Sequence, residues 1–287
     1  MNRRSGFTLI ELMVVVAIVA LLMSILMPAL GRARKSAESV SCQGRLKHWG
    51  LIYKLYTDDF DGYFYEGRGF AKHPKNKDKG GEQMGWWMNA LRPYYKDSWD
   101  LLFCPSATKI AESMQDFGTF RAYTAAKVVN RYRRPGEGST KDFYASYGEN
   151  SWISYMFTDQ NPVRKLEYFW KGIHNLTNAY NIPVFGDSTW FDAWPFSKDY
   201  PPKRPDDWMI YMGEQSGADE MKQFCINRHN GFINLLFMDM TVRKIGLKEL
   251  WTLKWHRQFD TKDIWTTAYA KDYIPDWPQW MSRFKEY

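Results

Sequence analysis

The chain has 287 residues, and 14 tryptophans, 18 tyrosines and 18 phenylalanines make up 17% of it. This aromatic content excludes a largely disordered chain, and the mean hydropathy of −0.54 excludes a polytopic membrane protein, which needs repeated apolar runs of about 20 residues. The net charge of +7 is scattered along the chain, so nucleic acid is not expected as a partner. The three cysteines and five histidines have no spacing typical of zinc ligands.

One apolar run of membrane-spanning length lies at the N-terminus. Residues 7–30 contain a single charge, Glu11, and Arg3 and Arg4 precede them. A secretory signal peptide would have a shorter apolar run and a small-residue cleavage site. A plain membrane anchor has no use for a carboxylate, which costs about 2.5–3.5 kcal/mol at the centre of a transmembrane helix. Basic residues flank both ends of the run, so the charges do not predict its orientation.

Residues 6–11, GFTLIE, resemble the processing site of type IV prepilins and of the pseudopilins of type II secretion. The resemblance implies that a prepilin peptidase cuts after Gly6 and that Phe7 becomes the N-methylated first residue. It also implies that Glu11 pairs with the N-terminal amine of a neighbouring subunit, because a charge in lipid is tolerated when it is paired. Pro28 matches the family's proline. It removes one helical hydrogen bond, so the helix is expected to be able to bend there.

Helical periodicity continues beyond the apolar run. Apolar and small residues recur at three-, four- and seven-residue intervals from Ala33 to Leu55, which predicts one helix from Phe7 to about Tyr56. The segment 58–62, DDFDG, has turn-forming residues that end it.

The resemblance implies an α+β lollipop, in which a long helix packs its second half on an antiparallel β-sheet head with long loops. The expected division is a removed leader at 1–6, a transmembrane and polymerisation segment at 7–30, and a periplasmic or extracellular head region at 31–287. Within the head, residues 182–187, 232–238 and 242–245 are predicted strands, the last two joined by a tight turn.

A second resemblance covers the head. Six segments resemble, in the same order, a large group of bacterial prepilin-like proteins with a C-terminal H-x9-D-G motif: CQGRL at 42–46, YTDDFDGY at 56–63, FCPS at 103–106, SYGEN at 146–150, FGD at 185–187 and RHNG at 228–231.

His229 and Asp239 have the H-x9-D spacing of this group, and Met240 stands where the group has glycine. A hydrogen bond between His229 and Asp239 that locks a hairpin is favoured over a metal or catalytic pair. The backbone conformation that glycine takes freely would cost about 1 kcal/mol at Met240, or Met240 would adopt another turn type.

The cysteines suit an oxidising compartment. Cys42 and Cys104 both lie in segments that carry the second resemblance, which favours a disulfide between them that ties the helix to the sheet. Cys225 would then be free, although the sequence alone leaves all three pairings open.

Calcium is a weaker expectation. Asp59 and Asp61, together with Asp58, offer carboxylates of the kind that Ca²⁺ binds. Turns that end the helix are favoured as their role.

The C-terminal tail contains five tryptophans, at positions 251, 255, 265, 277 and 280. Packing in the core is favoured for them, and the alternative is a stacking surface for a polysaccharide. The chain has no P-loop, nucleophile elbow, H-E-x-x-H motif or telling pair of carboxylates, so no catalytic residue and no enzyme activity are predicted.

The sequence therefore predicts a structural subunit of a type IV pilus-like or type II secretion-like pseudopilus filament. Its expected partners are a prepilin peptidase, other pilin-like subunits and an inner-membrane assembly platform. It would cross the bacterial inner membrane once, with its N-terminus cytoplasmic and its head periplasmic, or lie in a cell-surface filament after assembly. The alternative is a membrane-tethered protein that displays an aromatic-rich glycan-binding surface.

Overall fold

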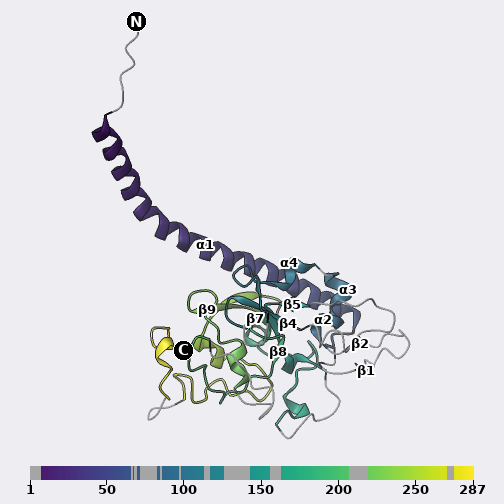
Figure 1. The fold of residues 1–287 in the computed structure, drawn as a ribbon. Helices are drawn as coiled ribbons and strands as arrows, with labels where there is room; N and C mark the ends of the chain where they lie inside the picture. Colours follow the sequence, from purple (N-terminus) through teal and green to yellow (C-terminus); the bar gives the residue numbers. More distant parts are fainter. Residues whose placement is uncertain are drawn as a thin grey trace.

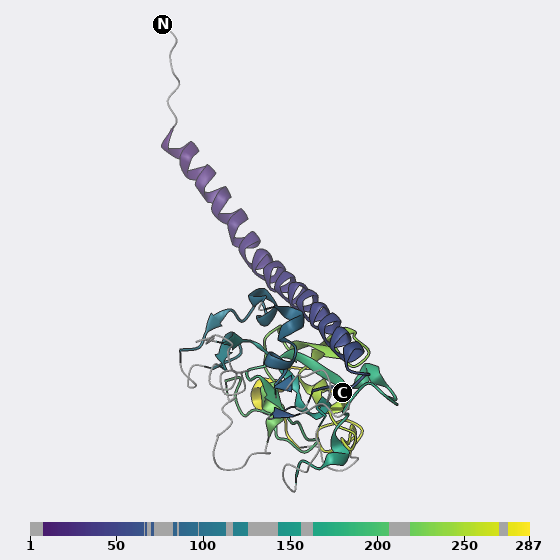
Figure 2. The same cartoon turned by 90° about the vertical axis from the view of Figure 1, so that its right-hand side faces the viewer.

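One long helix carries a β-sheet head at its C-terminal end (Figure 1). The structure is a computed structural model, and it describes residues 8–65, 67, 70–71, 83–84, 86–96, 98–112, 117–125, 143–155, 163–206, 219–269 and 275–287. The predicted α+β lollipop is confirmed, because the apolar N-terminal half of the helix stands away from the head (Figure 2).

Helix α1 (Leu9–Asp59) is 51 residues long and contains Pro28 without interruption. It begins at Thr8, whose side chain accepts a hydrogen bond from the backbone of Glu11. It ends where Gly62 donates to the carbonyl oxygen of Thr57 (2.6 Å) and takes a φ of +79°, which glycine adopts without a steric penalty. The predicted helix is thus confirmed, including its end in the aspartate-rich turn.

The two halves of α1 have opposite environments. Every side chain from Leu9 to Leu30 is exposed, and the first buried one is Ser39. From there on, one stripe of the helix is buried in the head: Ser39, Cys42, Leu46, Trp49, Gly50, Ile52, Tyr53, Tyr56 and Thr57. Their spacing of three and four residues is the period of one helix face.

A five-stranded sheet forms the centre of the head, in the order β10-β9-β7-β6-β8. Its strands are β6 (Tyr147–Asn150), β7 (Pro183–Asp187), β8 (Asp192–Ala193), β9 (Phe232–Phe237) and β10 (Val242–Gly246). All neighbours are antiparallel except β8, which runs parallel to β6. The three predicted strands correspond to β7, β9 and β10.

Helix α1 packs against β9, β10 and β7. A side chain at Gly50 would place its Cβ 2.9 Å from Leu236 on β9, so glycine lets the helix approach the sheet closely. Strand β9, with the sequence FINLLF, is buried along almost its whole length. Five of its six residues are apolar, as is typical of a strand that is buried on both faces.

Short elements surround this framework. The helices are α2 (Trp87–Ala90), α3 (Arg92–Tyr95) and α4 (Trp99–Leu102). The remaining strands are β1 (Phe70–Ala71), β2 (Gln83–Met84), β3 (Lys109–Ile110), β4 (Arg121–Thr124) and β5 (Tyr144–Ala145). The 3-10 turns are η2 (Ser151–Ile153), η3 (Leu166–Tyr168), η4 (Ala179–Asn181), η5 (Glu220–Gln223), η6 (Lys248–Thr252) and η7 (Gln279–Met281).

Aromatic rings fill much of the head core. Trp49 of α1 is fully buried, and its ring contacts those of Trp87, Tyr95 and Phe185 at centroid distances of 4.9–5.3 Å. In the tail, Trp251, Trp255 and Trp265 are buried, and Trp277 and Trp280 are partly buried against the same core. The favoured prediction of core packing for these tryptophans is therefore confirmed.

Candidate functional site

The N-terminal end of α1 carries the residues that the prepilin resemblance singled out. Gly6 and Phe7 lie outside the described residues. Thr8 and Glu11 form a capping box: the Thr8 amide donates to Glu11 Oε2 (2.8 Å), and the Glu11 amide donates to Thr8 Oγ1 (3.2 Å). A capping box satisfies two of the backbone N–H groups that a helix start leaves unpaired. In the single chain, the Glu11 carboxylate is held within its own first turn.

The apolar half of α1 is long and apolar enough to cross a membrane, and none of it is buried in the protein. Soluble proteins rarely expose so large a continuous apolar surface. The surface therefore needs either lipid or other protein around it.

Pro28 lies near the C-terminal end of this apolar half. Its ring nitrogen cannot donate to the carbonyl of Ser24, four residues earlier. The Ser24 hydroxyl meanwhile donates to the carbonyl of Leu21 (2.7 Å). Figure 1 shows α1 curving along its length without a break. The helix thus keeps its form through Pro28 with one backbone hydrogen bond fewer.

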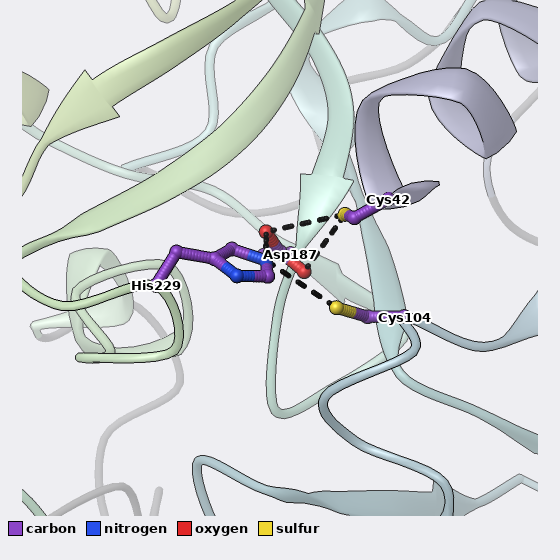
Figure 3. A group of neighbouring side chains, drawn as sticks. All are labelled: Cys42, Cys104, Asp187 and His229. Atoms are coloured by element: carbon purple, nitrogen blue, oxygen red, sulfur yellow. Dashed lines mark hydrogen bonds and ion pairs between the residues drawn. The ribbon is translucent and has the colours of Figure 1, made fainter. Parts of the chain in front are cut away.

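A second group of functional candidates lies buried where α1 meets the head. Cys42 comes from α1, Cys104 from the loop after α4, Asp187 from the end of β7, and His229 from the turn before β9 (Figure 3). Their sulfur, oxygen and nitrogen atoms all lie within 4.8 Å of one another. The cluster therefore draws together four segments that are far apart in the sequence.

The distances within the cluster are short and regular. Cys42 Sγ lies 3.7 Å from each carboxylate oxygen of Asp187. His229 Nε2 lies 3.1 Å from Asp187 Oδ2 and 3.4 Å from Cys104 Sγ. Figure 3 shows the four side chains pointing toward one another. At least three of the four side chains can therefore direct a lone pair of electrons toward one point between them.

Neighbouring groups fix the orientation of the Asp187 carboxylate. The buried guanidinium of Arg228 donates to Oδ1 (3.1 Å), and the backbone amide of Asn234 donates to Oδ2 (2.8 Å). The Tyr147 hydroxyl donates to Cys42 Sγ (3.3 Å). These three donors come from residues outside the cluster.

The charges of the cluster shift its pKa values. Burial alone would raise the pKa of Asp187, but the positive charges of His229 and Arg228 hold that pKa well below its usual range. Burial would lower the pKa of His229, yet the Asp187 carboxylate raises it to about 9. Burial is also the main cause of the raised pKa of the Cys104 thiol. Each of the two groups thus favours the charged form of the other.

The predicted lock between His229 and Asp239 is wrong. The carboxylate partner of His229 is Asp187. Asp239 is exposed in the β9–β10 turn, where it accepts hydrogen bonds from the backbone amide and the hydroxyl of Thr241 (3.0 and 2.6 Å). The nine-residue spacing misleads because β9, which lies between the two residues, carries them to opposite ends of a strand.

The hairpin itself is confirmed. Strands β9 and β10 pair antiparallel on either side of this turn, and Met240 takes a φ of +63°. It thus adopts the left-handed conformation of the glycine in the resembling group, at the expected cost of about 1 kcal/mol.

The predicted disulfide between Cys42 and Cys104 is not formed in this structure, where all three cysteines are free and buried. The two sulfurs are nevertheless close, since both belong to the cluster. Each sulfur also contacts another member of the cluster: Cys42 Sγ lies 3.7 Å from Asp187, and Cys104 Sγ lies 3.4 Å from His229. Cys225 lies outside the cluster.

The aspartates considered for calcium are engaged within the chain. The Asp58 carboxylate pairs with Lys54, and Asp59 Oδ2 accepts a hydrogen bond from the Tyr94 hydroxyl (2.7 Å). Asp61 takes a φ of +52° in the turn that ends α1. Within the described ranges, the one group of converging Cys, His, Asp or Glu ligands does not include these residues. Calcium binding at this turn stays a prediction.

Comparison with known families gives one match. Residues 1–27 match the family model of the prokaryotic N-terminal methylation motif. The match supports a type IV pilin-like precursor. No curated protein matches the chain, and no solved structure matches it. The family match ends at residue 27 and does not extend into the head.

Sequence reasoning did not assign a role to Asp187 or place the four cluster residues together. Cys42 and Asp187 are 145 residues apart, and Cys104 and His229 are 125 residues apart. Short-range ligand spacing cannot reveal a site built at such separations. A usable signal was present, because all four residues fall within the short segments of the second resemblance.

Proposed function

We propose that the mature chain is a structural subunit of a type IV pilus-like or type II secretion-like pseudopilus filament. The observation that carries the proposal is the exposed apolar half of α1, most of which lies within the residues that match the N-terminal methylation motif. A prepilin peptidase would remove residues 1–6 and methylate Phe7. The exposed helix would serve first as a membrane span and then as the contact between subunits.

The division of α1 supports this use. An exposed apolar helix is stable in lipid before assembly and among like helices after it, because both environments keep it from water. The second half of the same helix is fixed to the head. Subunits that stack their first halves would therefore arrange their heads around the outside.

Glu11 would supply the register between subunits. Its carboxylate bonds only to Thr8 among the described residues. The amine of a processed neighbour would offer it a charged partner, and a paired charge is tolerated in an apolar surrounding where a single one is costly. An assembly platform in the inner membrane would be needed to extract such a helix from lipid. The head would lie on the periplasmic side, or outside the cell once assembled.

The first test addresses processing. The chain is produced with a prepilin peptidase in membranes, and its N-terminus is read by mass spectrometry. The mature chain should begin with methylated Phe7, and a Gly6→Leu variant should still begin with Met1. A wild-type chain that retains Met1 would contradict the processing step.

The second test addresses assembly. Glu11→Ala is compared with Ser24→Ala, since Ser24 lies in the same exposed segment and its hydroxyl bonds within its own helix. Glu11→Ala should be processed but missing from sheared filaments, while Ser24→Ala should behave as the wild type. Normal incorporation of Glu11→Ala would show that the helix tethers the head without driving assembly.

A further inference from the structure

We propose that Cys42, Cys104, Asp187 and His229 form a tetrahedral site for a thiophilic divalent cation, with Zn²⁺ as the best-matched ion, and that this ion fastens α1 to the head. The site is independent of the filament role: it concerns how the chain holds its own helix. Its donor set of two sulfurs, one imidazole nitrogen and one carboxylate oxygen consists of ligand types that bind zinc in proteins.

Three of the six separations between the donor atoms fit the edges of a zinc tetrahedron. Zn–S bonds of about 2.3 Å and Zn–N or Zn–O bonds of about 2.0 Å place a sulfur about 3.5 Å from a nitrogen or oxygen, and a nitrogen about 3.3 Å from an oxygen. The corresponding separations are 3.7 Å for Cys42 and Asp187, 3.4 Å for Cys104 and His229, and 3.1 Å for His229 and Asp187. These three separations would change by only a few tenths of an ångström around one ion, and the other three pairs of donor atoms lie within 4.8 Å of each other.

The ring nitrogen Nε2 of His229 cannot donate to both of its close neighbours in the cluster. His229 Nε2 carries at most one proton, yet it lies within bonding distance of both Asp187 Oδ2 and Cys104 Sγ. If that proton points to the carboxylate, no proton of the ring is left on this nitrogen for the sulfur. A metal ion at the centre would instead accept one lone pair from each of the four side chains. These four bonds to the ion would then explain every close contact in the cluster.

The charges also balance around a divalent ion. Two thiolates and the Asp187 carboxylate carry three negative charges, while a divalent cation and the guanidinium of Arg228 carry three positive ones. Arg228 bonds to Asp187 at 3.1 Å, with both side chains fully buried. A buried group of charges is tolerated when it is neutral as a whole and fully paired.

Two of the four candidate ligands have the hydrogen-bond donors that an outer shell supplies, whereas Nδ1 of His229 is buried without a partner among the described residues. Asp187 is oriented by Arg228 and by the Asn234 amide, and Cys42 Sγ accepts the Tyr147 hydroxyl. Such hydrogen bonds commonly fix ligands around metal ions. All four candidate ligands are buried, with Cys42, Cys104 and Asp187 at 0% exposure and His229 at 5%. The ion would therefore have a closed, structural type of site.

The test measures the metal bound to the full-length chain. The chain is purified in detergent without chelator, and its zinc content is determined by inductively coupled plasma mass spectrometry. About one zinc per chain is expected. Cys42→Ser and Cys104→Ser should lose it, whereas Cys225→Ser should keep it, because Cys225 is also buried and free but lies outside the cluster.

Spectroscopy keeps the proposal testable if a serine variant fails to fold. Replacement of the ion by Co²⁺ in the wild type should give the absorption bands of tetrahedral cobalt and the charge-transfer bands of two thiolates. His229→Cys retains a ligand at that position, so it should keep one metal and strengthen the thiolate bands.

Two results would overturn the proposal. One is a chain without stoichiometric metal, both as purified and after incubation with Zn²⁺ under reducing conditions. The other is a native disulfide between Cys42 and Cys104, identified by non-reducing peptide mapping, in a chain that binds no metal after reduction. Either result would leave the filament proposal untouched, because its tests measure processing and assembly.

Discussion

Trp49 is the residue through which the helix should contribute most to the stability of the head. Its side chain is fully buried, and its Nε1 donates to the carbonyl oxygen of Leu101 (2.7 Å). Trp49→Ala removes the contacts with three neighbouring rings and leaves that carbonyl without its donor. Truncation of a buried tryptophan costs about 3–5 kcal/mol, and an unpaired buried acceptor adds about 1 kcal/mol.

The free energy of unfolding should therefore fall by about 5 kcal/mol in Trp49→Ala, a large share of the 5–15 kcal/mol typical of folded domains. Trp49→Phe keeps a ring and loses the hydrogen bond, so it should lose about 2 kcal/mol. Leu51→Ala is the matched control on the same helix, because Leu51 is 59% exposed. It should change the free energy by less than about 0.5 kcal/mol.

Urea unfolding of the full chain in detergent, followed by near-ultraviolet circular dichroism, measures these differences. The reasoning fails if Trp49→Ala and Leu51→Ala lower the free energy of unfolding equally. Such a result would mean that the head folds without the second half of α1 as part of its core.

Three further perturbations test other parts of the head. The pKa of His256 is lowered to about 3, mainly by burial and to a smaller extent by the charge of Lys254. The unfolded chain then binds one more proton between pH 6.5 and 3, and stability falls as the pH falls through this window. His256→Phe should reduce that slope by up to about 1.4 kcal/mol per pH unit in urea titrations at several pH values; an unchanged slope would contradict a buried neutral imidazole. A Cβ at Gly186 would lie 2.4 Å from a carbonyl oxygen of β9, so Gly186→Ala should cost at least about 2 kcal/mol. A Cβ at Gly44 would meet no atom within 4 Å, so Gly44→Ala should leave the stability unchanged or raise it. Equal melting temperatures of Gly186→Ala and Gly44→Ala would refute the close approach of Gly186 to β9. Glu220→Ala leaves the buried guanidinium of Arg164 without its carboxylate (2.5 Å) and should cost about 3–5 kcal/mol, whereas a loss below 1 kcal/mol in the same titration would show that the pair is hydrated.

The sequence predicted the long helix and the three main strands because their signals are local. The apolar period of α1, the turn residues after Tyr56 and the apolar run of β9 lie within short windows of the chain. Short elements such as α2 and β8 have no comparable period, and their positions depend on packing against the aromatic core.

The buried cluster could be predicted only in part, because it depends on tertiary structure. Two of its members, Cys42 and Cys104, were expected to be neighbours, and they are. His229 was expected to pair with Asp239 in the β9–β10 turn. The order of the strands instead places the end of β7 beside β9. That adjacency brings Asp187 to His229, and no pattern within a single segment indicates it.

The continuity of α1 has a mechanical consequence. If the N-terminal half is pulled along its axis, no flexible linker absorbs the load, because one helix runs from Leu9 to Asp59. The force passes as shear into the face between Cys42 and Tyr56, which lies along the sheet. Many side-chain contacts must then yield together. The head would therefore move as a rigid body with its helix under such a pull.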